Sequence, residues 1–346
     1  MITKHLVMNM AASEMYDIDN ASIALVVTSP PYPMIEMWDE CFCQQDGEIK
    51  TYLQNGLSTL AFERMHHILD QIWQEIDRVL MPGGIACINI GDATRTINGI
   101  FQMFSNHNRI ISAFGKMGYC VLPDIIWRKP SNSPNKFLGS GMYPAGAYVT
   151  YEHEYILIFR KGGKRIFTSN KKNMRQKSAY FWEERNVWFS DLWEIKGVKQ
   201  KIVGQKSRER SAAFPFEIPY RLINMYSIYG DTVLDPFVGT GTTLLAAMAS
   251  GRNSIGIDID PSFSELSIYT TQKEPQLLNQ YTEARLQEHQ RFIDSLSQEE
   301  QQKCYQNENH PFLVKTRQET KAHIPIISAA KSIVSGIECE YSWPSA

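Results

Sequence analysis

The sequence is poor in cysteine and lacks any long hydrophobic run, and each absence excludes a class of protein. Six cysteines lie scattered along 346 residues, too few and too dispersed for the disulfide framework of a small secreted protein. No apolar segment approaches the roughly 18 residues that a membrane-spanning helix needs. The first residues also lack the apolar stretch and small-residue cleavage site of a secretory signal. We therefore expect a cytoplasmic protein that does not bind a membrane.

Signatures of metal and nucleoside triphosphate binding are missing as well. Cys41 and Cys43 form the one close cysteine pair, and no second pair or His-x-His completes a zinc site, so we expect no metal. A G-K-[ST] sequence is absent, which excludes the P-loop of ATPases. What remains is an ordinary globular composition, with 43% hydrophobic and 21% charged residues, and a length sufficient for a sizeable core.

The charge is unevenly distributed, although the net charge is only −2. Residues 161–210 contain 14 Lys or Arg against 5 Asp or Glu. A basic block in an otherwise mildly acidic protein is a candidate surface for phosphate groups. On charge alone, a solvated charged face is an equally good interpretation.

Hydrophobic periodicity predicts an α/β domain with a largely parallel sheet. The predicted strands are 21–28, 84–90, 121–127, 155–159, 232–235 and 254–258, and the predicted helices are 59–80, 108–116, 217–226 and 242–249. The part of the chain before the basic region and the part after it each contain too few strands for a parallel sheet covered on both faces. We therefore predict one core, formed by residues 1–164 and 211–260, with an inserted region at 165–210. Residues 261–346 are expected to form a helical extension.

The first chemically informative motif follows the strand predicted at 232–235. It reads DPFVGTGTT over residues 235–243, so a glycine-containing turn opens a helix near Thr242. Such glycines let the backbone approach a ligand, and the helix start offers free N–H groups. Asp258 ends the next strand, where a nucleotide-binding unit places a carboxylate for ribose hydroxyls. Leu244 replaces the third glycine of the dinucleotide motif, which argues against NAD. For the glycines alone an ordinary tight turn is the better interpretation, but the placed second acid reverses that preference.

The second motif, Thr28-Ser29-Pro30-Pro31-Tyr32, directly follows a buried strand. Its two prolines fix the backbone and remove two N–H donors. The carbonyls of Ser29 and Pro30 could then face a cleft at the carboxyl end of the strand, where open α/β sheets bind ligands. Tyr32 adds an aromatic plane. The combination suits a planar ring with an exocyclic amine. For this motif alone a rigid turn with a buried tyrosine is the better interpretation, but the DPFVGTGTT motif reverses that preference.

With these two motifs the sequence resembles the amino-methylating DNA methyltransferases that use S-adenosylmethionine. TSPPY at 28–32 is similar to their catalytic motif and DPFVGTGTT at 235–243 to their methyl-donor motif, in the order of the circularly permuted β group. The resemblance implies a doubly wound, mostly parallel, seven-stranded and circularly permuted sheet with an inserted DNA-recognition region. Further matching stretches are RVLMPGG at 78–84, INIGD at 88–92, DIIWRKP at 124–130, EHEYIL at 152–157 and FPFE at 214–217.

The resemblance also implies roles for individual residues. Ser29 and Pro30 would hold the target amine, and Tyr32, after Pro31, would stack on the base. Asp258 would bind the ribose of S-adenosylmethionine. The other donor-binding residues would be Thr28, Phe214, Pro215, Asp235, Pro236, Phe237, Gly239, Gly241 and Thr242. Where the family usually has a Gly-Asp pair, this chain has Asn9-Met10-Ala11-Ala12.

Serine rather than aspartate at position 29 is similar to family members that modify cytosine N4. We therefore predict a sequence-specific DNA methyltransferase that flips a cytosine out of the duplex and methylates its amine. Adenine N6 is the alternative target. Two other classes are a non-catalytic DNA-binding regulator, disfavoured by the intact TSPPY, and a glutamine-methylating protein methyltransferase, disfavoured by Ser29 and the basic region.

The expected partners follow from the same resemblance. Double-stranded DNA is the expected macromolecular partner, and a restriction endonuclease acting on the same site is a possible second one. We expect a monomer or a homodimer. Within the basic region, the residues predicted to contact DNA are Lys171, Lys172, Arg175 and Lys177.

Overall fold

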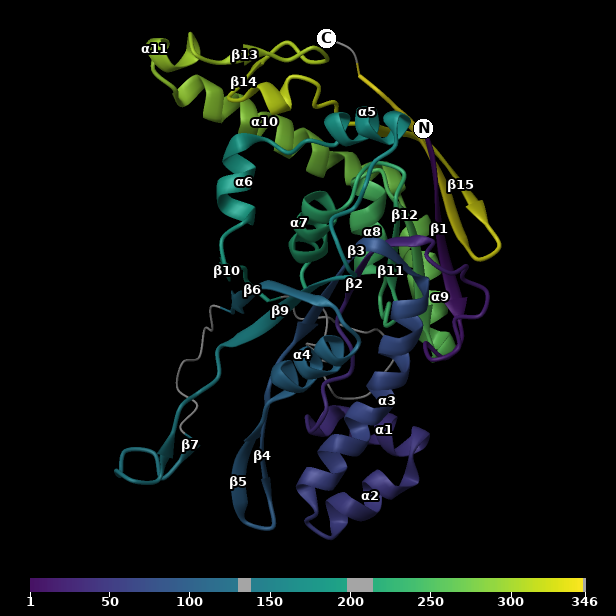
Figure 1. Cartoon of the computed structure of the whole chain (residues 1–346), viewed down its shortest axis with the longest axis vertical. Coiled ribbons are helices and arrows are strands. Elements are labelled where there is room, and N and C mark those ends of the chain that lie inside the picture. The colour runs from purple at the N-terminus through teal and green to yellow at the C-terminus, as the bar shows by residue number, and fades with distance from the viewer. Residues whose placement is uncertain (130–137, 198–213, 345–346) are drawn as a thin grey trace.

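The computed structural model describes residues 1–129, 138–197 and 214–344. Its centre is a sheet with the strand order β10-β6-β9-β3-β2-β11-β12-β1-β16-β15. The strands are β1 (Ile2–Asn9), β2 (Ile23–Thr28), β3 (Leu80–Ile90), β6 (Cys120–Arg128), β9 (His153–Arg160), β10 (Leu192–Glu194), β11 (Thr232–Asp235), β12 (Asn253–Asp258), β15 (Ile326–Ile333) and β16 (Gly336–Ser342). Strands far apart in the chain therefore lie side by side in the centre of the molecule (Figure 1).

The predicted doubly wound, mostly parallel sheet is confirmed. Its seven-stranded core runs from β6 to β1, and β9 alone is antiparallel to its neighbours β3 and β6 within that core. Strand β2 lies between β3 and β11 and is buried over all six residues. Burial on both faces explains why this strand reads as a continuous apolar run.

Helices cover both faces of the sheet, and the alternation of side chains along the central strands decides which residues face which helices. Val26 and Ala86 belong to the hydrophobic cluster formed with α3 (Ser58–Val79) and α4 (Asn106–Lys116). Their neighbours Val27 and Cys87 point the other way, into the cluster formed with α7 (Glu217–Tyr226) and α8 (Thr242–Ala249). The two apolar layers hold the carboxyl ends of the central strands in fixed positions.

The edges of the sheet differ from the prediction. β1 was not predicted, because it has no continuous apolar run and its buried side carries the polar residues Thr3 and His5. It pairs in parallel with β12 and in antiparallel fashion with β16. At the opposite edge, β10 of the inserted region pairs with β6, so this region is partly integrated into the core sheet.

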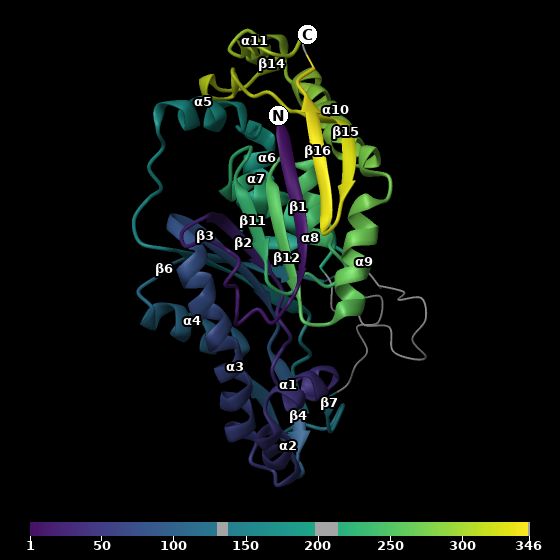
Figure 2. The ribbon, with the colours of Figure 1, turned by 90° about the vertical axis from the view of Figure 1, so that its right-hand side faces the viewer.

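The C-terminal extension, predicted to be helical, ends in a hairpin instead. Its helices are α9 (Pro261–Gln272), α10 (Asn279–Ser295) and the short α11 (Gln298–Gln301), and β15 and β16 follow them. The hairpin lies against β1 (Figure 2). A Cβ atom at Gly336 would lie 1.9 Å from the carbonyl oxygen of His5, so glycine permits this close strand pairing.

Smaller elements surround the core. They are α1 (Asp39–Gln45), α2 (Gly47–Gln54), α5 (Ser169–Lys177), α6 (Trp182–Trp188), and the short strand pairs β4 (Ala93–Ile97) with β5 (Ile100–Phe104), β7 (Leu138–Gly139) with β8 (Ala147–Tyr148) and β13 (Tyr305–Gln306) with β14 (Leu313–Val314). Helices α1 and α2 and the β4–β5 hairpin lie together at one end of the molecule (Figure 1). Among the described residues, no helix combines the length and hydrophobicity needed to cross a membrane.

Candidate active site

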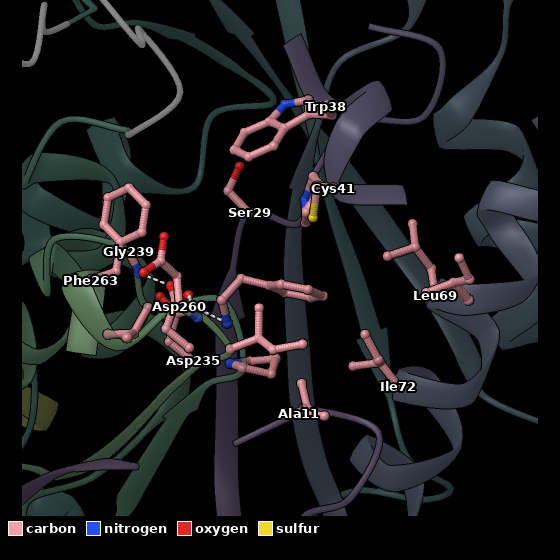
Figure 3. Close-up of a pocket in the computed structure, with 18 of the residues that line it drawn as sticks. Ala11, Ser29, Trp38, Cys41, Leu69, Ile72, Asp235, Gly239, Asp260 and Phe263 are labelled. Atoms are coloured by element: carbon pink, nitrogen blue, oxygen red, sulfur yellow. Dashed lines mark hydrogen bonds between the residues drawn. The ribbon is translucent and has the colours of Figure 1, made fainter. Parts of the chain in front are cut away.

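A cavity of about 420 Å³ lies at the carboxyl ends of β2, β11 and β12. Ser29 and Trp38 line one part of it, Asp235, Gly239 and Phe263 another, and side chains of α3 a third (Figure 3). The volume is in the range of small-molecule sites. Both motifs singled out in the sequence therefore reach one cavity, at the end of the sheet where open α/β folds bind ligands.

Asp235 connects the two motifs. One of its carboxylate oxygens accepts hydrogen bonds from the Thr28 hydroxyl at 2.6 Å and the Phe237 backbone N–H at 3.1 Å. The other accepts the Thr243 hydroxyl at 2.5 Å. Burial, only partly offset by these hydrogen bonds, raises the pKa of Asp235 to about 6. Asp235 thus lines the cavity, but its carboxylate oxygens accept hydrogen bonds from β2 and from the turn and helix that follow β11.

Asp258 leaves more capacity for a ligand. Its oxygens accept backbone N–H groups from Gly239 at 3.1 Å and from Asp260 at 3.0 Å, with a further backbone contact from Ile259. A carboxylate has about four acceptor positions, so it can still accept a hydrogen bond from a ligand. Burial raises the pKa of this carboxyl group. Asp258 lies at the end of β12 and lines the cavity, which is the position the sequence predicts for a ribose acceptor.

The turn between Asp235 and α8 requires its glycines. Gly239 and Gly241 have φ values of +51° and +86°, in a region that favours glycine. A Cβ atom at Gly241 would also lie 3.1 Å from the Ser267 hydroxyl oxygen. Gly239, Thr240 and Thr242 line the cavity, so the start of α8 faces it, with backbone N–H groups suited to a polar ligand.

The predicted catalytic turn directly follows β2. Ser29 and Pro31 line the cavity, Pro30 is buried, and Tyr32 is half-buried. The Tyr32 hydroxyl donates to Glu154 at 2.8 Å and accepts from the Asn89 side chain at 2.8 Å. Neither partner was predicted as a site residue. Both lie in stretches that resemble the family, INIGD and EHEYIL, and this was the signal available in the sequence.

The remaining residues predicted to bind the donor do not all line the cavity. Phe214, Pro236, Phe237 and Thr242 line the cavity, whereas Pro215 and Gly241 are buried beside it. Several lining residues were not predicted: Ala11, Ala12, Met37, Trp38, Cys41, Leu69, Ile72 and Phe263. Most come from the loop after β1 and from α1 and α3, elements that meet the motifs only in the folded chain. No cluster of three or more potential metal ligands occurs in the described parts of the chain.

The four basic residues predicted to bind DNA are not brought to this cavity. Lys171, Lys172, Arg175 and Lys177 belong to α5. The Ser178 hydroxyl after this helix accepts the backbone N–H of Tyr229, which precedes the amino end of β11, whereas the cavity lies at the carboxyl end. Figure 1 shows α5 beside the amino terminus of the chain. The rest of the basic block, residues 198–210, lies outside the described residues.

Comparison with known protein families matches residues 23–269 to the family described as DNA methylase. The type II methyltransferase M.MthZI of Methanothermobacter thermautotrophicus is 50% identical over 324 residues, covering 92% of this chain and 89% of the relative. M.MjaI of Methanocaldococcus jannaschii is 53% identical over 275 residues, covering 76% and 90%.

Solved structures show the same fold. The TTHA0409 protein of Thermus thermophilus, solved in complex with S-adenosyl-L-methionine, has a TM-score of 0.58 and 32% identity and covers 77% of this chain and 94% of its own. The cytosine-N4-specific PvuII DNA methyltransferase has a TM-score of 0.51 and covers 82% and 94%. Its identity of 19% makes this a likeness of fold alone.

Proposed function

Because this chain belongs to the DNA methylase family, we propose that it transfers the methyl group of S-adenosyl-L-methionine to the exocyclic N4 of a flipped cytosine in double-stranded DNA. The observation that carries the proposal is that Ser29 and the glycine turn of Asp235 line one cavity. A target amine held at Ser29 would therefore lie close to a donor held at the turn. Proximity of this kind can supply much of a rate enhancement.

The donor side of the cavity fits S-adenosyl-L-methionine. Asp258 retains lone pairs for ribose hydroxyls, Gly239 and Gly241 allow the backbone to approach a ligand, and Phe263 offers apolar surface. Phe214, which also lines the cavity, is proposed to flank the methionine end. The bound donor supplies a methyl group already activated by its positive sulfur. The chain itself therefore needs only to position the target amine and to stabilise the charge that develops on its nitrogen.

The target side requires acceptors. An exocyclic amine is a weak nucleophile, because its lone pair is delocalised into the ring. As the nitrogen forms its bond to carbon it becomes positive, and acceptors at its N–H groups stabilise that charge. We propose Ser29 and the Pro30 carbonyl for this role and Tyr32 as the aromatic that contacts the base. A base must leave the duplex to reach such a cavity, at a cost of a few kcal/mol.

Two further parts of the proposal concern the target base and the purpose of the methylation. The preference for cytosine N4 over adenine N6 is supported by serine at position 29. The proposal that methylation protects DNA from a restriction endonuclease is supported by the names of M.MthZI and M.MjaI, which are type II methyltransferases.

The test is product analysis. The protein is incubated with S-adenosyl-L-methionine and unmethylated bacteriophage lambda DNA, and the DNA is digested to nucleosides for mass spectrometry. We expect N4-methylcytosine, and no product from Ser29→Ala. Finding only N6-methyladenine would overturn the choice of base but not the reaction. Finding no methylated nucleoside in several unmethylated DNAs would favour a non-catalytic DNA-binding protein.

A further inference from the structure

A chain of polar side chains lies behind Ser29 and extends across four neighbouring strands of the sheet. We call it the Ser29 network; its members are Ser29, Tyr32, Asn89, Lys129 and Glu154. Asn89 lies in β3, Glu154 in β9, and Lys129 directly follows β6. Ser29 and Tyr32 follow β2. Only Ser29 among these five lines the cavity, so Asn89, Glu154 and Lys129 act on a ligand through their contacts with Tyr32 and Ser29.

The network is closely connected. The Tyr32 hydroxyl lies 2.8 Å from Glu154 Oε2 and 3.1 Å from Ser29 Oγ. The Asn89 side-chain amide donates to Tyr32 Oη at 2.8 Å and to Glu154 Oε2 at 2.7 Å. The Lys129 ammonium group forms an ion pair with the other Glu154 oxygen. The Asn89 amide also approaches Ser29 Oγ at 3.5 Å, so every member has at least one partner whose donor or acceptor character is fixed.

The direction of each hydrogen bond follows from these fixed partners. A carboxylate only accepts, and a side-chain NH₂ group only donates. Turning the Asn89 amide over would place its oxygen against the Glu154 carboxylate, so its nitrogen faces Glu154 and Tyr32. The Tyr32 hydroxyl must then donate to Glu154. Burial and the negative charge of Glu154 raise the pKa of Tyr32, which keeps this proton in place.

The lone pairs of Tyr32 Oη therefore face Asn89 and Ser29. Since Tyr32 has no second proton to give, the Ser29 hydroxyl is the donor in the 3.1 Å contact between them. Its single proton is used there. The Asn89 amide approaches Ser29 Oγ at 3.5 Å and takes at most one of its lone pairs, so another remains for a ligand. A free serine can donate or accept, but in this network Ser29 can offer a ligand only acceptors.

We propose that Glu154, held by Lys129, is a positioning residue that makes Ser29 an obligate hydrogen-bond acceptor and thereby selects an amino group on the target base. This inference rests on the proposed function. It explains how a neutral serine can present only hydrogen-bond acceptors to the target amine, as an ionised carboxylate at the same position would. A base with a carbonyl oxygen at the same place, such as thymine, would meet lone pair against lone pair and be rejected.

Glu154→Gln is the decisive substitution, because it preserves shape and changes polarity. Lys129 attracts the amide oxygen of the new glutamine, so its NH₂ group faces Tyr32 and Asn89. The Asn89 amide then turns over, so that its oxygen accepts from the glutamine, and Tyr32 no longer has a carboxylate to which it must donate. Ser29 is therefore no longer held as the donor in its contact with Tyr32. We expect the single-turnover methylation rate on lambda DNA to fall about 10- to 100-fold. The Kd for S-adenosyl-L-methionine, measured by calorimetry, should stay within about twofold of wild type.

Tyr32→Phe tests whether Glu154 acts through the tyrosine. It keeps the ring and removes the hydroxyl that orients Ser29, so the rate should fall to a similar extent. Adding Glu154→Gln to Tyr32→Phe should then cause no more than about a threefold further loss, because coupled residues give non-additive effects.

Glu152→Gln is the matched control. Glu152 lies two residues before Glu154 and outside the network, at 3.8 Å from Arg128, and its substitution should leave the rate unchanged.

The outcomes are distinguishable. If the wild-type protein methylates DNA while Glu154→Gln retains more than about a third of the rate, the positioning role is wrong. Multiplicative losses in the double variant would also overturn it, as would a parallel loss of donor affinity, which indicates a merely structural role. If the wild-type protein methylates no DNA, the proposed function fails, and the inference falls with it.

Discussion

At the scale of single residues, Asp235 and Asp258 show how two carboxylates of one cavity differ in function. Asp235 is 2% exposed and bonds to both Thr28 and Thr243, so it joins the end of β2 to the start of α8. Asp258 is half-buried and keeps lone pairs for a ligand. We therefore expect substitutions of Asp235 to alter stability and substitutions of Asp258 to alter donor binding.

Asp235 should make stability depend on pH. Its folded-state pKa of about 6 lies above the usual value near 4 for an unfolded aspartate, so folding favours the protonated form. Its contribution is complete below about pH 4 and is lost as pH rises through about 6. Relative to Asp235→Asn, the wild-type free energy of unfolding should fall by up to about 3 kcal/mol between pH 4 and pH 7.

Urea unfolding at several pH values measures this difference. Asp294→Asn, at an exposed position on α10, is the control and should run parallel to wild type. A constant difference between wild type and Asp235→Asn would show that the Asp235 carboxyl titrates normally.

Asp258→Ala should weaken donor binding. Removing a charged acceptor of ribose hydroxyls costs roughly 1.5–3 kcal/mol, which corresponds to about a 10- to 100-fold higher Kd. Calorimetry with S-adenosyl-L-methionine measures this loss, and circular dichroism checks that the variant is folded. An unchanged Kd in a folded variant would exclude Asp258 from the donor site.

At the scale of elements, α5 carries the four basic residues predicted to contact DNA, and its packing bears on that prediction. Arg175 and Lys177 lie over the rings of Phe167 and Trp343, each at 4.8 Å from the ring centroid. The helix is attached near the amino end of β11, away from the cavity. Each phosphate contact contributes about 0.9 to the log–log slope of DNA affinity against salt.

We therefore expect little change in that slope when Lys171, Lys172, Arg175 and Lys177 are all replaced by Gln. The matched set is Lys199, Lys201, Lys206 and Arg208, also four charges. They belong to the same basic block but not to α5, and their replacement should flatten the slope. Fluorescence anisotropy on labelled duplex DNA at several salt concentrations measures both. A slope lowered by about 3 in the α5 variant alone would place DNA on α5.

At the scale of the whole molecule, the inserted region and the C-terminal extension form one module. Phe181 before α6 packs with Phe312 and Ile324 in a small separate core. Glu184 of α6 forms two hydrogen bonds to Arg285 of α10, and the side chains of the pair are only 11% and 6% exposed. The two segments are about a hundred residues apart in the chain, so neither can be understood alone.

Breaking this ion pair should destabilise the protein. Glu184→Gln leaves the Arg285 charge buried without its partner, at a cost of about 3 kcal/mol. Glu194→Gln is the control, because Glu194 and Arg128 are 57% and 54% exposed, and exposed pairs contribute less than about 1 kcal/mol. Thermal unfolding of both variants tests the difference. Equal melting temperatures would mean that the module contributes nothing to global stability.

The sequence by itself determined the architecture of the core and the two motifs of the site. The short, β-branched apolar run 23–28, bounded by Pro30 and Pro31, indicated a buried strand, and glycine at 239 and 241 permits the positive φ angles found there. The order of TSPPY before DPFVGTGTT, together with a carboxylate after the next strand, was enough to predict the family. Such signals are local, so one chain reveals them.

Only the tertiary structure decided what lies around those motifs. β1 and the β15–β16 hairpin lack a continuous apolar run, and they become strands because a sheet edge is there to pair with. The Ser29 network draws on four separate strands, and no spacing in the sequence relates Glu154 to Ser29. The position of α5 likewise depends on which end of the sheet it packs against. Contacts between distant segments are fixed by packing, which local sequence does not encode.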